Sequence, residues 1–356
     1  ACAEQKNRLV IFEYLGELGF IERLADYEKR SAALESGQER RVITAVMVGR
    51  VGGASDTWNE VKDWFPFDLL GLLGMASGAD VDAPWLEFRS DSGALVRRWH
   101  VPLRMPDYSK GHVAIDERIH TGVGRLVTCA LASKEFGDMH LRVAIRHLID
   151  GLGYEQPIEE RIGHFCRGID GLCKAYDLTG VNLLKRVGEK YRSKVRKTIA
   201  EAAKAIKALA AQAAGSGDTD DSAVLETIAN RTISNPAYVD YNFGNAAIRL
   251  MQHFGLADAE VMARFLGAEG SSTAEGLRKW AKWLSDCRGI AMHGGHFDVA
   301  GGRHDAKLLW KTAQHLLDIL LRMVFRIVGY DGTYRPAVAA RFGGLHPWAW
   351  TERGKM

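Results

Sequence analysis

The chain has 356 residues, of which 47% are hydrophobic and 26% charged, the ordinary composition of a soluble globular protein. The formal net charge is only +3, which excludes a globally basic protein and requires any nucleic-acid site to be a local patch. Five scattered cysteines without a CxxC pair exclude a disulfide framework, and no apolar run has the length of a membrane span. We therefore expect a cytoplasmic protein with room for two domains, no signal peptide and no membrane contact.

The first 135 residues carry a mixed pattern of strands and helices. Residues 9–27 alternate between the two patterns, whereas residues 41–48 are rich in β-branched side chains and predict a strand. Residues 68–75 predict a short buried helix. The remaining elements predicted here are a hairpin at residues 85–90 and 94–101, a strand at 112–119 and a short helix or strand at 124–133. We interpret residues 1–135 as an α+β domain that senses a trigger or selects a substrate.

From residue 138 onward, apolar side chains recur at helical spacing. Ile162, Ile169 and Cys173, for example, fall on one face of a single predicted helix. The predicted helices are at residues 138–150, 158–175, 178–214, 221–233, 245–254, 258–266, 274–292 and 305–328. The last of these is so apolar that it must be buried in the helical bundle or at a dimer face.

The predicted fold class is therefore α+β. A strand-containing N-terminal domain at residues 1–135 precedes an all-α helical bundle at residues 136–330 and a C-terminal tail at residues 331–356. The tail carries tryptophans and arginines, and we expect it either to pack back on the N-terminal domain or to reach across a dimer.

The predicted helix at 178–214 contains a local excess of positive charge. Nine basic residues lie between Lys185 and Lys207, opposed only by Glu189 and Glu201. Such a patch suits the phosphates of RNA, and an ordinary solvated helix face is an equally good interpretation. The candidate RNA-binding residues are Lys190, Arg192, Lys194, Arg196 and Lys197.

A short motif closes the predicted helix at 274–292. Arg288 and His293 are separated by four residues, and Gly294-Gly295 predicts the end of the helix. On an ideal helix the two side chains point about 140° apart. They meet only if the helix loosens after Gly289, if Arg288 wraps around it, or if a second copy of the chain supplies the missing neighbour.

An arginine and a histidine together suit the cleavage of RNA. The guanidinium binds phosphate oxygens, and the imidazole exchanges protons with the 2′-hydroxyl or the leaving oxygen, so no metal or cofactor is required. The simplest alternative is a surface arginine beside a histidine that caps a helix. A zinc site built from His293, His296, His304 and Asp298 would be another, although their spacing matches no metal motif.

Arg288 to His293 resembles the R-x4-6-H motif of HEPN-domain ribonucleases, and the surrounding helices and whole-chain layout resemble ApeA-like HEPN proteins of phage defence. The resemblance implies a metal-independent endoribonuclease that cleaves RNA, such as tRNA, in antiphage defence, abortive infection or as a toxin. It also implies a homodimer in which two motifs share one cleft, and a phage trigger or an antitoxin as a partner. Active members often carry Asn, Asp or His directly after the arginine, where this chain has Gly289; Asp286 is a candidate substitute.

Two further hypotheses stay open beside the ribonuclease. One is a catalytically weak HEPN module that binds RNA or a protein partner, and Gly289 is the feature in its favour. The other is a structural helical scaffold. It predicts that Arg288 is buried in an intrachain ion pair and that His293 lies far from any cleft.

Overall fold

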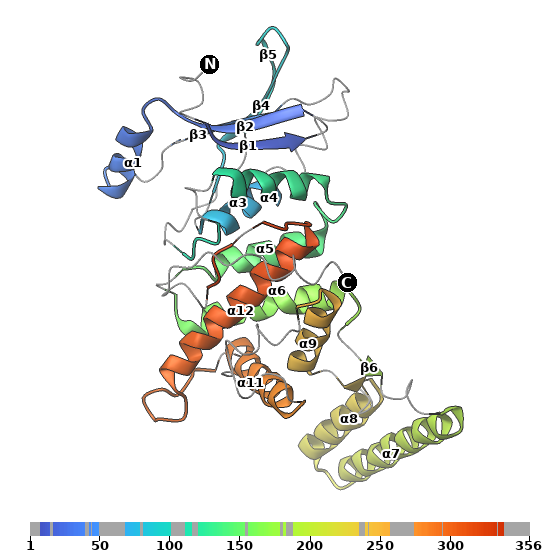
Figure 1. Cartoon of the computed structure of the whole chain (residues 1–356). Helices are drawn as coiled ribbons and strands as arrows, with labels where there is room; N and C mark the ends of the chain where they lie inside the picture. Colours follow the sequence, from blue (N-terminus) through green and yellow to red (C-terminus); the bar gives the residue numbers. More distant parts are fainter. Residues whose placement is uncertain are drawn as a thin grey trace.

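The computed structural model describes most of the chain (Figure 1). The described residues are 8–14, 17–39, 43, 45–49, 68–78, 81–100, 111–115, 120–153, 156–178, 181–182, 188–234, 239–240, 242–256, 274–293, 295–332 and 334–337. The helix predicted at 258–266 lies outside them.

A three-stranded antiparallel sheet begins the chain. It consists of β1 (Arg8–Tyr14), β2 (Glu17–Arg23) and β3 (Ala45–Val48) in that order, and α1 (Tyr27–Glu35) connects the last two. The segment 9–27, which the sequence left unassigned, thus supplies two strands. The strand predicted at 41–48 is confirmed over its second half.

Two helices and a hairpin complete the N-terminal part. The buried helix α3 (Leu70–Ser77) and the hairpin of β4 (Trp85–Arg89) and β5 (Leu95–His100) are confirmed predictions. The segment 124–133, predicted as a short helix or strand, belongs to the helix α4 (His120–Ala132). The strand predicted at 112–119 was wrong for residues 112–115, which form no strand; residues 116–119 are outside the described part.

The helical part is built around α12 (Ala306–Ile327). Its middle is buried on all sides, and it packs against α5 (Met139–Asp150) and α6 (Ile158–Ala175). The helices α9 (Phe243–His253) and α11 (Ala274–Met292) also pack against α6 and against each other. The apolar helix predicted at 305–328 is therefore buried within one chain.

The main hydrophobic core extends across residue 135. Leu72, Ile115 and Leu126 from the N-terminal part belong to the same cluster as the helical core, while Val10 and Phe12 lead a smaller cluster under the sheet. The domain boundary at residue 135 stays a prediction, because the packing is continuous there.

The first residues of the tail pack back on the N-terminal part. The Arg335 amide donates a hydrogen bond of 2.7 Å to the carbonyl of Ala114, and the Nε2 atom of His112 lies 2.7 Å from the carbonyl oxygen of Arg335. Tyr334 and Ala337 are buried. The expectation that the tail packs on the N-terminal domain is confirmed for residues 334–337, and residues 338–356 lie outside the description.

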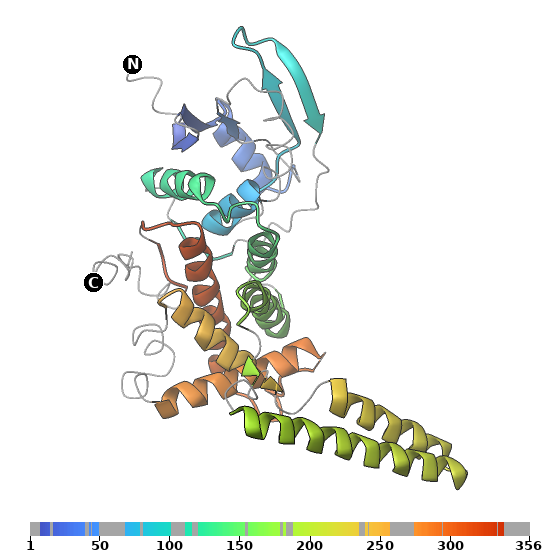
Figure 2. The same cartoon turned by 90° about the vertical axis from the view of Figure 1, so that its right-hand side faces the viewer.

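A helical hairpin projects from the body, made of α7 (Glu189–Gly215) and α8 (Thr219–Ser234) (Figures 1 and 2). At its base β6 (Val181–Asn182) pairs with β7 (Val239–Asp240). The helix predicted from residue 178 was wrong at its start, because residues 181–182 pair as a strand and α7 begins only after Gly188. The α+β fold class is confirmed. Across the described residues, no helix combines the length and apolarity needed to cross a membrane.

Candidate functional site: the Arg288–His293 segment

Arg288 lies on the side of α11 that faces α6. The apolar residues of α11, such as Trp280, Leu284 and Cys287, enter the core, and Arg288 follows at its edge. Its Nη2 atom donates a hydrogen bond of 3.0 Å to Oδ2 of Asp170 on α6. The Arg288 side chain is 21% exposed and that of Asp170 is 9% exposed. The arginine is therefore held in a fixed place by a nearly buried carboxylate.

The surroundings of this ion pair are partly apolar. The guanidinium carbon of Arg288 lies 5.6 Å from the centre of the Phe243 ring, and the Nζ atom of Lys174 lies 3.9 Å from the same Asp170 oxygen. Burial raises the pKa of the Cys166 thiol and raises the pKa of Cys287 to about 12. Both thiols stay protonated at neutral pH, so neither serves as a nucleophile.

His293 is exposed at the end of α11. The helix runs unbroken through Met292, and the backbone N–H of His293 donates a hydrogen bond of 3.3 Å to the carbonyl of Gly289. The helix therefore does not loosen after Gly289. Arg288 does not wrap around it either, because its side chain binds Asp170. Within one chain the two side chains therefore do not meet, and the arrangement that uses a second copy stays a prediction.

Asp286 shares the side of His293 and not that of Arg288. His293 is seven positions after Asp286, which places both on one face of an ideal helix, about 10 Å apart along its axis. The Asp286 side chain is exposed and forms no hydrogen bond or ion pair with any other described residue. Around Gly289 there is open space, since an added Cβ would have no neighbour within 4 Å.

The basic residues of α7 divide between two faces. Lys190, Lys194 and Lys197 recur at spacings of four and three residues, so they form one exposed stripe. Arg192 and Arg196 lie on a different side of the helix, and Arg192 pairs with Glu189 at 3.1 Å. The predicted RNA-binding residues therefore lie on the projecting hairpin, on an element separate from the one that carries Arg288.

The loop histidines considered for zinc do not gather. Nδ1 of His304 accepts a hydrogen bond of 3.0 Å from the Asp298 amide, and the Nδ1 atom of His296 lies 3.9 Å from Oε1 of Glu159. Among the described residues, the group with the geometry for a metal is instead His147, Asp150 and His164.

Sequence reasoning missed Asp170. This residue lies beside the apolar stripe of α6, between Cys166 and Cys173. An acidic residue at such a position is the feature of the sequence that could have indicated a buried partner for Arg288. Comparison with known proteins adds no further information, because no family model, curated protein or solved structure matches the chain.

Proposed function

We propose that this chain is a metal-independent endoribonuclease that acts as a homodimer. His293 serves as the proton donor or acceptor, and Arg288 binds and neutralises a phosphate. An exposed imidazole can take the proton of a 2′-hydroxyl or return one to the leaving oxygen near neutral pH. The guanidinium stays charged throughout and presents several N–H donors in a fixed plane.

The observation that carries the proposal is the fixed orientation of Arg288. A long arginine side chain loses conformational entropy when it binds a phosphate, and the bond to Asp170 removes much of that freedom in advance. The partial exposure of Arg288 leaves an edge of the side chain accessible to a ligand. Asp170 therefore acts as a positioning residue for the arginine.

The dimer follows from the direction of the two side chains. Because α11 is unbroken, Arg288 and His293 of one chain diverge by about 140°. One site with both groups is formed when Arg288 of one copy lies beside His293 of the other. In a twofold-symmetric dimer this arrangement gives two equivalent sites.

The projecting hairpin supports the choice of RNA as the substrate. The exposed stripe of Lys190, Lys194 and Lys197 can follow a phosphate backbone, and its distance from the body suits a long or folded RNA such as tRNA. The N-terminal part would then sense a phage trigger or receive an antitoxin. The proposed role is therefore that of a cytoplasmic protein in antiviral defence, in abortive infection or as a toxin.

Incubating the purified chain with mixed RNA in the presence of EDTA tests the proposal. We expect cleavage by the native protein and its loss in His293→Ala. The matched control is His296→Ala, which removes an exposed imidazole three residues further along and should leave cleavage unchanged. Equal decay of RNA in native protein and His293→Ala, or no decay in either, contradicts the nuclease.

A catalytically weak module that binds RNA or a protein partner is the second candidate. The observation in its favour is that Arg288 forms an intrachain ion pair and is mostly buried, as a purely structural role also predicts. Gly289 supports it too, since it lacks the polar side chain frequent in active HEPN domains. This candidate predicts RNA binding by the native chain with no cleavage that depends on His293.

A further inference from the structure

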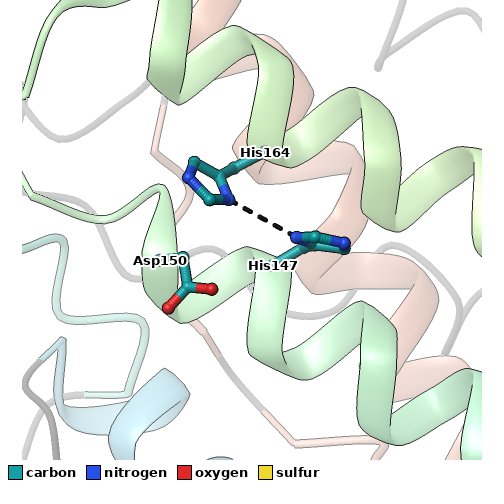
Figure 3. A group of neighbouring side chains, drawn as sticks. All are labelled: His147, Asp150 and His164. Carbon is teal, nitrogen blue, oxygen red and sulfur yellow. Dashed lines mark hydrogen bonds between the residues drawn. The ribbon is translucent and has the colours of Figure 1, made fainter.

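Two histidines and an aspartate meet between α5 and α6, away from the segment discussed above (Figure 3). His147 and Asp150 lie one turn apart on α5, so both side chains leave the same face of that helix. His164 comes from α6 and its ring faces that of His147. The potential ligand atoms of the three residues all lie within 4.8 Å of one another.

Gly168 of α6 lies one turn beyond His164 and close to both α5 and α12. A Cβ on Gly168 of α6 would lie 2.8 Å from a methyl carbon of Leu320 and 3.5 Å from the Cβ of His147. The first distance is too short for a real contact, whereas the second is an ordinary van der Waals contact, so the packing of α6 against Leu320 of α12 requires this glycine and its packing against α5 does not. The two rings are brought together by the packing of α5 on α6.

The distance between the rings fits two ligands of one metal ion. The Nδ1 atoms of His147 and His164 are 3.4 Å apart. That is long for a hydrogen bond between nitrogens. Two nitrogens bound to one tetrahedral Zn²⁺ at the usual bond length of about 2.0–2.1 Å are separated by about 3.4 Å. The two imidazoles therefore already have the spacing that a shared metal ion requires, and the Asp150 carboxylate, within 4.8 Å of them, would move closer when an ion binds.

The protonation of the histidines is also suitable. Burial, and for His147 also the proximity of His164, lowers the pKa of both imidazoles. At neutral pH both rings are therefore neutral, which is the form that binds metals. Each ring is about half-buried, so a small ion can reach the cluster from solvent.

The charges around the cluster have opposing effects. Arg146 on α5 pairs with the Asp150 carboxylate through bonds of 2.7 and 3.1 Å, and Arg167 on α6 lowers the pKa of both histidines. Glu160 on α6 acts in the opposite direction on His164. The Arg146 side chain is 43% exposed, so it can turn into solvent and release Asp150 at little cost.

We propose that His147, Asp150 and His164 bind one divalent transition-metal ion such as Zn²⁺, with a fourth coordination position open to solvent. Two imidazoles and a carboxylate form a ligand set typical of zinc and neighbouring metals. The ion would tie α5 to α6, the helix whose Asp170 holds Arg288. This site goes beyond the proposed function, since the cleavage assigned to Arg288 and His293 uses no metal.

Binding of Zn²⁺ and Co²⁺ to the full chain, stripped of metal by a chelator, tests the site. We expect one ion per chain by calorimetry, a higher melting temperature with Zn²⁺, and the absorption spectrum of tetrahedral Co²⁺. The variants His147→Gln, His164→Gln and Asp150→Asn should each weaken binding more than about 100-fold, beyond the loss seen for outer-shell changes. The control His140→Gln removes an exposed histidine of the same helix and should bind normally.

The variant Arg146→Gln distinguishes a metal site from an anion site, because the guanidinium that it removes repels a cation and attracts an anion. Loss of the competing guanidinium should tighten Zn²⁺ binding a few-fold, the equivalent of one exposed ion pair. The proposal is overturned if the native chain binds no ion, if binding survives in the His147→Gln/His164→Gln double variant, or if Arg146→Gln weakens it. Circular dichroism of each metal-free variant checks that the helices are retained.

Discussion

The indole N–H of Trp280 on α11 donates a hydrogen bond of 2.8 Å to Nε2 of His315 on α12, with both side chains fully buried. An imidazole that accepts at Nε2 must be neutral and carry its proton on Nδ1. Burial, together with the nearby charges of Arg322 and Lys311, lowers the pKa of His315 to about 3. Two core helices are thus joined by a bond that exists only in the neutral state of the histidine.

This bond predicts a loss of stability in mild acid. The unfolded histidine titrates near 6.5 and the folded one near 3, so between these values the unfolded chain binds the extra proton. The contribution of His315 is fully present above pH 6.5 and decreases by about 1.4 kcal/mol per pH unit below it. Urea unfolding of the native chain at pH 7 and pH 5 measures the effect.

His315→Gln is the control, because a glutamine oxygen can still accept the Trp280 N–H. Other buried histidines such as His112 titrate in both proteins and cancel in the comparison. The free energy of unfolding of the variant should depend less on pH than that of the native chain. An unchanged pH dependence would show that His315 does not hold its neutral form in the core.

The Arg288–Asp170 pair predicts a strong coupling in stability. Arg288→Ala removes the arginine that binds the nearly buried Asp170 carboxylate at 3.0 Å, and should lower the free energy of unfolding by about 3 kcal/mol. Adding Asp170→Asn removes the stranded charge and should restore much of this loss. Denaturant unfolding of the four proteins of the cycle gives the coupling energy.

The same double variant shows whether Arg288 is needed only for the stability of the fold or also for the cleavage of RNA. Arg288→Ala/Asp170→Asn should be folded and yet unable to cleave RNA. Cleavage at the native rate by the restored double variant would mean that Arg288 has only a structural role.

The helices could be predicted from the sequence because local periodicity determines them. Both α6 and α11 were predicted with the bounds they have, since each has a continuous apolar stripe between clear end signals. The start of α7 was missed, because the pairing of residues 181–182 with 239–240 depends on a contact far along the chain. Local helix propensity was overridden there by tertiary structure.

The site could be predicted only in part for the same reason. Arg288 and His293 are neighbours in sequence and were found from their spacing. Asp170 and the His147–His164 contact depend on which faces of α5, α6 and α11 meet, and a single helical pattern does not contain that information. His147 in particular lies at helical spacing from the buried Leu141 and Ala144, so its position in the sequence indicates packing rather than binding.

Gly289 gives a prediction about activity. There is room at this position for a side chain, so Gly289→Asn and Gly289→Ala should both fold and gain up to about 1 kcal/mol of helix stability. Only asparagine adds a polar group next to Arg288, and we expect it to raise the rate of RNA cleavage several-fold above that of the alanine variant. Equal rates in the two variants would show that the glycine does not limit activity.

The lysine stripe on α7 gives a prediction about binding. Lys194→Gln/Lys197→Gln should weaken RNA binding for all sequences alike and reduce the salt dependence by about 1 for each lost phosphate contact. The control Lys29→Gln/Lys134→Gln removes the same charge from exposed positions on other elements. Titration of labelled RNA at several salt concentrations measures, for each double variant, how steeply the binding constant falls with salt. Equal weakening by the two pairs would assign the effect to net charge alone.

A composite active site makes its own prediction, because Arg288 and His293 would come from different copies. Arg288→Ala and His293→Ala should each be inactive alone. When they are mixed and allowed to exchange subunits, half of the dimers are mixed and each contains one intact site, so activity should return to roughly a quarter of the native value. Adding Asp170→Asn to the arginine variant protects it from unfolding during the exchange. If the mixture stays inactive while exchange is shown by two differently tagged copies, both groups must act from the same chain, and the proposed arrangement of α11 across the dimer is wrong.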